Sequence, residues 1–314
     1  MKSLATARRV TIPSFDLSES PVWDARNRCW VFVDINAGTS HKFDYLHGEV
    51  SLLTDLSDSS PSPAWKHMCA LIPREQGGYV AIGTQGIAVT DNKGTIDFGS
   101  YVQLQTDPRI RFNDVQSIGG RLLGGTIDCA KFADSIAAFG EITPGGFKVI
   151  EGQHVISNGL AVSPDGMTLF HIESTVPFIA KFDRDPTTGE LTNYRPSFGI
   201  IDGLNFFKDR DHKGAPKALG DGMAAAMYNG TFVLCVAEWG LSRIGIYDPA
   251  TKKMIAQIDV PVSRPTSLSF GGDDYRTILI TSERIGHDPA DNCGLFLANV
   301  EGLTGFAPTP VNWL

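Results

Sequence analysis

The chain has 314 residues and a net charge of −8, from 27 basic and 35 acidic residues. No cluster of Lys or Arg stands out, and an acidic chain of this kind repels a phosphate backbone, so we expect no nucleic-acid partner. No apolar run approaches the roughly 18–20 residues of a membrane span, so we expect no membrane partner either. Residues 1–15 lack the apolar segment of a secretory signal, and we therefore expect a soluble, cytoplasmic protein.

The cysteines are five in number, widely spaced and without a Cys-x-x-Cys pair. This pattern argues against a disulfide framework and against a thiolate metal site. We expect buried, reduced thiols, as in the apolar run around Cys235.

A polar opening, a short apolar run, a tight turn and a second apolar run recur along the chain. The openings stand at positions 19, 69, 113, 158, 221 and 267, at spacings of 44 to 63 residues. A period of roughly 40–50 residues with several short strands in each repeat is typical of a β-propeller blade. We therefore predict an all-β, six-bladed β-propeller, formed as a single domain over residues 1–314.

In chain order, the turns within these units fall at residues 27–28, 77–78, 119–120, 164–166, 229–230 and 271–274. The fourth unit is the clearest, because Pro164-Asp165-Gly166 separates two apolar runs and so predicts a β-hairpin. Asn158 stands at the start of its first strand. The longest insertion, Phe198 to Gly220, is expected to be a loop over one end of the propeller, at the mouth of a site.

The innermost strands of a propeller run along its central channel, so the first residues of different blades meet at one end. Here that set includes two carboxylates and two amides, from Glu19, Asn113, Asn158 and Asp221. Two like charges brought together away from water are costly, and a divalent cation between them is the simplest remedy. All-oxygen ligation favours Ca²⁺ or Mg²⁺, followed by Mn²⁺, over Zn²⁺. We therefore predict a central metal site.

Each of these residues also has an ordinary structural interpretation. Asn-Gly and Asp-Gly are common turn dipeptides, so Asn158 and Asp221, taken singly, are turn residues more often than ligands. Glu19 alone is most simply a solvated loop residue. The shared position of these polar residues within the repeat favours the metal site.

Several motifs together resemble the senescence marker protein/regucalcin/gluconolactonase family of six-bladed propellers. The resemblance runs from about Ser18 to Pro308 and is specific because the motifs occur in one order. They are Glu19-Ser-Pro-Val-Trp-Asp24, Arg111-Phe-Asn-Asp114 with Gly125-Thr126, Ser157-Asn-Gly-Leu160 with Ser163-Pro-Asp-Gly166, Asp221-Gly-Met223, and Arg264-Pro-Thr-Ser267 with Phe270-Gly-Gly272.

The resemblance implies one divalent cation, Ca²⁺ first among the candidates, held by Glu19, Asn158 and Asp221. It also implies that Arg111 and Asn113 contact the substrate, with Asn113 near the metal as well. Family members often carry a Glu shortly after the Gly-Thr pair that touches substrate hydroxyls. This chain has no Glu there, and Asp128 is the candidate to take its place.

These parts predict a metal-dependent lactonase that opens a sugar-type lactone to the hydroxy acid with a metal-activated water. The cation would polarise the carbonyl and stabilise the oxyanion. Asp221 is the candidate general base, or the group that orients a metal-bound hydroxide. Arg111 supplies a fixed fork of donors for lactone oxygens, although a surface salt bridge is its ordinary interpretation.

Two other functions fit the same residues. The metal site could hydrolyse phosphotriesters, as in the related diisopropyl fluorophosphatase type of propeller, or the chain could be a calcium-binding regulatory protein with little catalysis. A plain protein-binding propeller is disfavoured, because acidic and amide residues facing the channel would then have no partner. The expected partner is therefore a small-molecule lactone.

Overall fold

The structure is a computed structural model that describes residues 2–11, 15–57, 65–130, 132, 134–201, 205–210, 216–284 and 293–313. Within these ranges every regular element is a β-strand, and they contain no helix. It follows that no helix of the described chain has the length and apolar character needed to cross a membrane. The chain divides into two compact units, unit 1 (residues 1–14 and 158–307) and unit 2 (residues 15–157 and 308–314).

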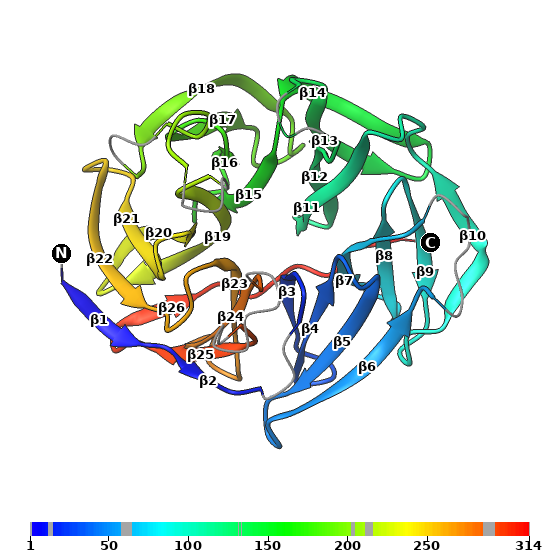
Figure 1. The fold of residues 1–314 in the computed structure, drawn as a ribbon, viewed down its shortest axis with the longest axis horizontal. Coiled ribbons are helices and arrows are strands. Elements are labelled where there is room, and N and C mark those ends of the chain that lie inside the picture. The colour runs from blue at the N-terminus through cyan, green and yellow to red at the C-terminus, as the bar shows by residue number, and fades with distance from the viewer. Residues whose placement is uncertain are drawn as a thin grey trace. The chain divides into compact units, whose positions relative to one another are not determined.

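Unit 2 contains three antiparallel sheets of four strands each, and the strands of each sheet can be followed in Figure 1. The first sheet has β3 (Ser18–Asp24), β4 (Cys29–Asp34), β5 (Thr39–Asp44) and β6 (Glu49–Asp55). The second has β7 (Met68–Pro73), β8 (Tyr79–Gly83), β9 (Gly86–Thr90) and β10 (Ile96–Gln103). The third has β11 (Ile110–Ile118), β12 (Arg121–Asp128), β13 (Ala137–Thr143) and β14 (Gly146–His154).

Unit 1 contains the other three sheets. The fourth sheet has β15 (Ser157–Val162), β16 (Thr168–Glu173), β17 (Phe178–Arg184) and β18 (Leu191–Gly199). The fifth has β19 (Leu219–Tyr228), β20 (Thr231–Trp239), β21 (Arg243–Asp248) and β22 (Lys253–Asp259), with β1 (Ser3–Thr6) and β26 (Leu303–Gly305) added at its edges. The sixth has β23 (Pro265–Gly271), β24 (Thr277–Ser282), β25 (Phe296–Asn299) and β2 (Arg8–Arg9).

Successive four-stranded antiparallel sheets confirm the predicted all-β fold class, a six-bladed β-propeller. All six predicted openings lie in the first strand of a sheet, from Glu19 in β3 to Ser267 in β23. The hairpin predicted from the fourth unit is β15–β16, and its turn glycine, Gly166, has a φ of +72°. The prediction of a single domain stays a prediction.

The N-terminal segment completes two sheets of unit 1. Arg8 and Arg9 pair antiparallel with β25 and give the sixth sheet its fourth strand. β1 pairs with the outer strand β22 in a parallel register, from Ser3 to Thr6 (Figure 1). Pairing of this kind satisfies the backbone groups of strand edges that would otherwise be open to other chains.

Burial decreases across each sheet from its first strands to its last. β4 is buried at every position, whereas β6, the outer strand of the same sheet, is exposed at three of its seven residues. The core therefore lies around the first three strands, and within unit 1 it includes Ala226, Val233, Leu268 and Phe270. Polar side chains that lie in the first strands are consequently buried, and each must find a partner.

A β-bulge interrupts the first strand of several sheets at the polar opening. In β11, Asn113 and Asp114 stand opposite one residue of β12, because Phe112 pairs with Thr126 and Val115 with Gly124. The register shifts in the same way at residues 221–222 of β19 and at residues 20–21 of β3. Bulges commonly change the direction of side chains next to functional sites. Here they interrupt the regular up-and-down alternation of side chains at the polar start of each of these strands.

Two glycines beside these openings allow the first strands of neighbouring sheets in unit 1 to approach closely. A Cβ on Gly159 would lie 2.5 Å from the Asp221 carbonyl oxygen and 2.7 Å from the Met223 nitrogen. A Cβ on Gly222 would lie 2.2 Å from Ser267 Oγ. Neither glycine has a positive φ, so both serve close packing and the turn interpretation of Asn-Gly and Asp-Gly is wrong here.

Asp114 is a buried carboxylate within the β11 bulge. Its residue is 5% exposed, and Oδ2 has no hydrogen-bond partner in the described residues. Burial disfavours the charged form and raises the pKa of Asp114 to about 6, while the Val115 backbone N–H opposes the shift. The folded protein therefore holds this proton more tightly than the unfolded chain does.

We expect Asp114→Asn to stabilise the protein at pH 8 and to have little effect at pH 4. The raised pKa means that wild-type stability falls as pH rises from about 4 to about 6, by up to about 3 kcal/mol, and is then constant. Asn carries no charge, so the variant escapes this loss. Urea unfolding from pH 4 to pH 8, with EDTA present so that no bound cation contributes, measures the difference. The exposed Asp97→Asn is the control, and a difference that does not change with pH would contradict the expectation.

Candidate active site

Asn158 and Asp221 form the closest pair among the predicted site residues. Asn158 Nδ2 lies 2.6 Å from Asp221 Oδ1 and donates a hydrogen bond to it. The two residues are 6% and 7% exposed and come from the first strands of neighbouring sheets in unit 1, β15 and β19. The pair forms because Gly159 lets the two strands approach and the bulge at 221–222 re-aims the Asp221 side chain.

Ser174 fixes the orientation of the Asn158 amide. Its Oγ lies 2.6 Å from the Gly220 carbonyl oxygen and 3.1 Å from Asn158 Nδ2. A carbonyl oxygen can only accept a hydrogen bond, so the Ser174 hydroxyl donates its proton to the Gly220 carbonyl. Ser174 Oγ must therefore accept the hydrogen bond from Asn158 Nδ2. The Asn158 NH₂ group therefore faces Ser174 and Asp221, and the carbonyl oxygen Oδ1 faces away from them.

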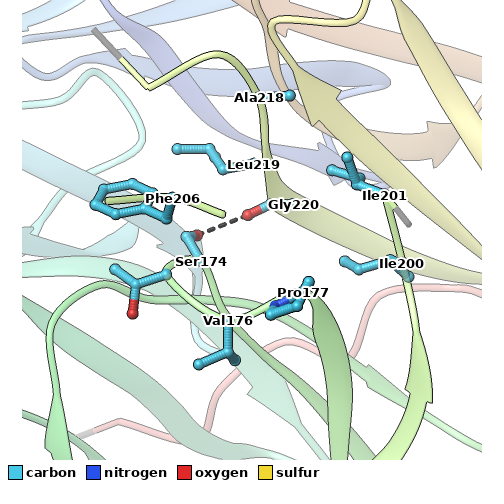
Figure 2. A pocket seen from close by; sticks show the side chains of 10 residues that line it. Ser174, Val176, Pro177, Ile200, Ile201, Phe206, Ala218, Leu219 and Gly220 are labelled. Atoms are coloured by element: carbon cyan, nitrogen blue, oxygen red, sulfur yellow. Dashed lines mark hydrogen bonds between the residues drawn. The ribbon is translucent and has the colours of Figure 1, made fainter. Parts of the chain in front are cut away.

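A small pocket in unit 1 adjoins Ser174 and is lined in part by the insertion at 198–220. Figure 2 shows the Ser174 hydroxyl at the pocket wall, hydrogen-bonded to Gly220. Residues 202–204 and 211–215 of that insertion lie outside the described residues, and its place at the mouth of a site stays a prediction.

This arrangement fits a hard divalent cation. In the described residues Asn158 Oδ1 accepts no hydrogen bond, and a carboxylate and an amide oxygen are ligands that Ca²⁺ and Mg²⁺ prefer. A bound cation would also offset the cost of burying the Asp221 charge. The described residues hold no group of three or more His, Cys, Asp or Glu side chains placed for a metal, so a site here depends on the amide and on further oxygens.

Arg111 and Asn113 form a second pair, in unit 2. Arg111 Nη1 donates to the Phe112 carbonyl and to Asn113 Oδ1, both at 2.8 Å. Asn113 Nδ2 donates to the Ser157 carbonyl oxygen at 3.0 Å, one residue before Asn158 in the chain. Asn113 thus links Arg111 to the backbone of Ser157, the last residue of this stretch of unit 2, and holds the guanidinium in place.

Arg111 is a buried cation without a carboxylate partner in the described part of the chain. The residue is 8% exposed, which rules out the surface salt bridge considered from the sequence. It lies beside the Cys69 thiol, whose pKa burial raises to about 11 against the opposing effect of Arg111, so Cys69 is a neutral thiol at neutral pH. A buried guanidinium with N–H groups to spare is a binding group for the oxygens of a ligand.

Glu19 is buried in β3, at 8% exposure, so its interpretation as a solvated loop residue is wrong. Its Oε2 accepts the Ser20 backbone N–H at 2.7 Å. Ser20 has a φ of +48°, a strained conformation for a non-glycine residue, and its Oγ donates to the Cys69 carbonyl at 3.0 Å. The bulge therefore holds the Glu19 carboxylate in a fixed place in unit 2.

Asp128 holds a loop of unit 2. It is 1% exposed, and its two carboxylate oxygens accept the backbone N–H groups of Ala130, at 3.1 Å, and Asp134, at 3.0 Å. These contacts tie Ala130 and Asp134 to the end of β12. The prediction that Asp128 also contacts the substrate stays a prediction.

The structure thus joins Asn158 to Asp221 in unit 1 and Arg111 to Asn113 in unit 2, while Glu19 and Asp128 lie in unit 2. Ser174 is the residue that sequence reasoning missed. It directly follows β16, and the only signal in the sequence is a small polar residue at the end of an apolar strand. That signal is weak, because such residues commonly end strands.

Known proteins resemble this chain over most of its length. The family model described as the SMP-30/gluconolactonase/LRE-like region matches residues 17–284. Regucalcin from Danio rerio is 30% identical over 278 residues, which cover 87% of this chain and 85% of that protein.

Two solved structures share the fold. A calcium-binding protein, regucalcin, from Agrobacterium tumefaciens has a TM-score of 0.81 and 20% identity, and the match covers 100% of this chain and 99% of that one. A gluconolactonase from Xanthomonas campestris has a TM-score of 0.66 and 17% identity, with 95% and 91% covered. Since the family model spans most of its residues, the chain belongs to the SMP-30/gluconolactonase/LRE-like family.

Proposed function

We propose that this chain is a divalent-cation-dependent lactonase that opens a sugar-type lactone to its hydroxy acid. The observation that carries the proposal is the buried Asn158–Asp221 pair at 2.6 Å, with an amide oxygen left for a cation. Membership in a family that includes gluconolactonases supports lactonase chemistry. Location in the cytoplasm stays a prediction from the sequence.

We propose Glu19, Asn158 and Asp221 as the residues that hold the cation, with Ca²⁺ first and Mg²⁺, Mn²⁺ or Zn²⁺ as other candidates. All three are buried oxygen donors, and the Agrobacterium relative is described as calcium-binding, which supports Ca²⁺. When bound, the cation supplies Lewis acidity that polarises the lactone carbonyl and offsets the negative charge that develops on it.

The chain's own residues bind the lactone and move the proton. Arg111 donates N–H groups to the lactone oxygens, and Asn113 keeps the guanidinium oriented. The Asp221 carboxylate takes a proton from the attacking water, whose oxygen bonds to the carbonyl carbon. The ring C–O bond then breaks, and the ring oxygen takes up the proton held by Asp221 to become the hydroxyl group of the product, which returns Asp221 to its carboxylate form.

Two other functions use the same residues. A calcium-binding regulatory protein with little catalysis is favoured by the relatives named regucalcin. A phosphotriester hydrolase would use the same oxygen donors for phosphorus chemistry. The experiments below separate all three.

We expect Asp221→Asn to lower kcat for a gluconolactone-type substrate by about 10²- to 10⁴-fold, because Asn keeps the shape of Asp but cannot take up the proton. Acid release at constant pH measures the rate. Thermal unfolding shows whether the variant keeps its fold. The control is Asp274→Asn, whose side chain is 65% exposed in the same unit. An unchanged kcat in a folded Asp221→Asn protein would remove Asp221 from the mechanism.

Removal of divalent cations with EDTA should abolish lactone hydrolysis, by at least about 100-fold, and added Ca²⁺ should restore it. Isothermal titration should show one Ca²⁺ site in the wild-type protein and a much weaker site in Asn158→Ala. Ca²⁺ binding without hydrolysis of any lactone would favour the regulatory protein. Cleavage of phosphotriesters alone would favour the phosphotriester hydrolase, and full lactonase activity in EDTA would overturn the proposal.

Arg111→Lys should lower kcat/KM for the lactone by at least about tenfold, because Lys cannot reproduce the planar fork that contacts both Asn113 and the substrate. Arg109→Ala is the matched control, since Arg109 is two residues away and pairs with Asp107 with 49% of its side chain exposed. Equal kcat/KM values for wild type and Arg111→Lys would show that Arg111 does not bind substrate.

A further inference from the structure

His67 lies directly before β7 in unit 2, and its backbone is tied to the strand that carries Arg111. Thr84, between β8 and β9, makes this link. Its Oγ1 accepts the His67 backbone N–H at 2.9 Å, and its carbonyl oxygen accepts the Phe112 backbone N–H at 3.0 Å. The Phe112 carbonyl in turn accepts from Arg111 Nη1 at 2.8 Å. One residue, Thr84, therefore holds His67 against β11 next to Arg111.

The side chains around His67 confirm this neighbourhood. The Cys69 thiol, two residues further along, lies beside the Arg111 guanidinium, and the positive charge of Arg111 acts on the His67 ring. The Cys69 carbonyl accepts Ser20 Oγ at 3.0 Å, and Ser20 directly follows Glu19. All of these residues belong to unit 2, so they form one cluster whose geometry does not involve unit 1.

The His67 ring has a fixed tautomer. Its Nδ1 lies 3.1 Å from the Ile35 carbonyl oxygen. That oxygen can only accept a hydrogen bond, so Nδ1 carries the ring proton and the neutral ring presents a lone pair at Nε2. Within the described ranges Nε2 has no hydrogen-bond partner, and the residue is half-buried, which leaves the ring accessible to a small ligand.

The ring is neutral at neutral pH. Burial lowers the pKa of His67 below its ordinary value, and the positive charges of Arg111 and Lys66 act in the same direction, against the effect of the Ile35 carbonyl. Nε2 is then a hydrogen-bond acceptor. This is the opposite of the guanidinium beside it, which only donates.

A donor and an acceptor side by side match a hydroxylated ring. A plain alkyl lactone brings acceptor oxygens only, which Arg111 can bind, and it leaves His67 Nε2 without a partner. A lactone with hydroxyl groups brings donors as well. An oxygen and a hydroxyl on neighbouring ring atoms can therefore satisfy both side chains at once.

We propose that His67 selects hydroxylated lactones, with Nε2 accepting a hydrogen bond from a ring hydroxyl while Arg111 donates to an oxygen of the same ring. The proposal rests on the proposed lactonase function and adds a specificity residue to it. It assigns the sugar-type character of the substrate to a named acceptor. A hydrogen bond of this kind corresponds to about 3- to 10-fold in affinity.

Two lactones, one with hydroxyl groups and one without, test the proposal. We expect His67→Phe to lower kcat/KM for glucono-δ-lactone by about 3- to 10-fold and to leave kcat/KM for δ-valerolactone unchanged. His67→Gln, whose amide oxygen can reach the position of Nε2, should recover part of the loss. His47→Phe is the control, because the His47 side chain is 69% exposed in the same unit. Equal losses for both lactones in a folded variant would overturn the role of His67 and leave the lactonase intact.

The corresponding lactams separate recognition from chemistry, because lactams resist hydrolysis. We expect the wild-type protein to bind glucono-δ-lactam more tightly than δ-valerolactam in isothermal titration, and His67→Phe to reduce this preference by about 3- to 10-fold. Such a result would support the role of His67 even if no lactone were hydrolysed. A preference that is absent, or that His67→Phe does not change, would overturn it whatever the lactonase assay shows.

Nitrogen-15 NMR of histidine-labelled protein reads the tautomer directly. The His67 signals are identified by their loss in His67→Phe. We expect the ¹⁵N shift of His67 Nε2 to be that of an unprotonated nitrogen in the free protein at neutral pH, and to move when glucono-δ-lactam binds. A protonated Nε2 in the free protein, or a shift that does not respond to the lactam, would contradict the proposal.

Discussion

The Asn158 amide is held between Ser174 and the Asp221 carboxylate, and this contact requires a close approach of the backbone strands around it. The two strands that carry the pair must approach so closely that a side chain at position 159 would meet the Asp221 carbonyl at 2.5 Å. Glycine at 159 removes that obstacle, and the bulge in β19 turns Asp221 toward the amide. The site therefore depends on the packing of strands rather than on a flexible loop, which favours precise positioning of its groups.

The same strands carry the polar site and the hydrophobic core. In β19 the bulge at its start bears buried Asp221, and Met223 and Ala226 beyond it pack into apolar clusters of unit 1. Fully burying a large aliphatic side chain contributes roughly 1.5–3 kcal/mol, so the apolar part of each strand offsets the cost of the polar part. The strained φ of Ser20 and the raised pKa of Asp114 show that this cost recurs at other openings.

The sequence predicted the sheets and their first strands well, because both depend on local patterns. Turn glycines such as Gly166 and the alternation of apolar runs are visible within a few residues, and the repeat places Glu19, Asn158 and Asp221 near the start of the first strand of a sheet. What it could not predict are contacts between distant segments. The Asn-Gly and Asp-Gly pairs have the composition of turns, and only the neighbouring strand reveals that Gly159 and Gly222 serve close approach.

Ser174 and Asp128 show in two different ways that the sequence does not reveal contacts between side chains and distant backbone groups. Ser174 has no motif, yet its single proton decides which way the Asn158 amide faces. Asp128 stands near a family motif, yet the structure uses its carboxylate to hold backbone N–H groups. The role of each polar side chain depends on which acceptor lies near its donor in the folded chain, and the sequence alone does not show that acceptor.

The proton of Ser174 has a second consequence, because the Ser174 hydroxyl cannot donate it to any other acceptor while it is bonded to Gly220. Donated to Gly220, it forces the Asn158 amide to offer its oxygen as a ligand, and it is then no longer available in the pocket that Ser174 helps to line. If the Ser174 hydroxyl donated a hydrogen bond to a ligand instead, it would lose its bond to the Gly220 carbonyl and would no longer fix the orientation of the Asn158 amide. The geometry that prepares Asn158 for a cation therefore depends on an unbroken hydrogen bond between Ser174 and Gly220.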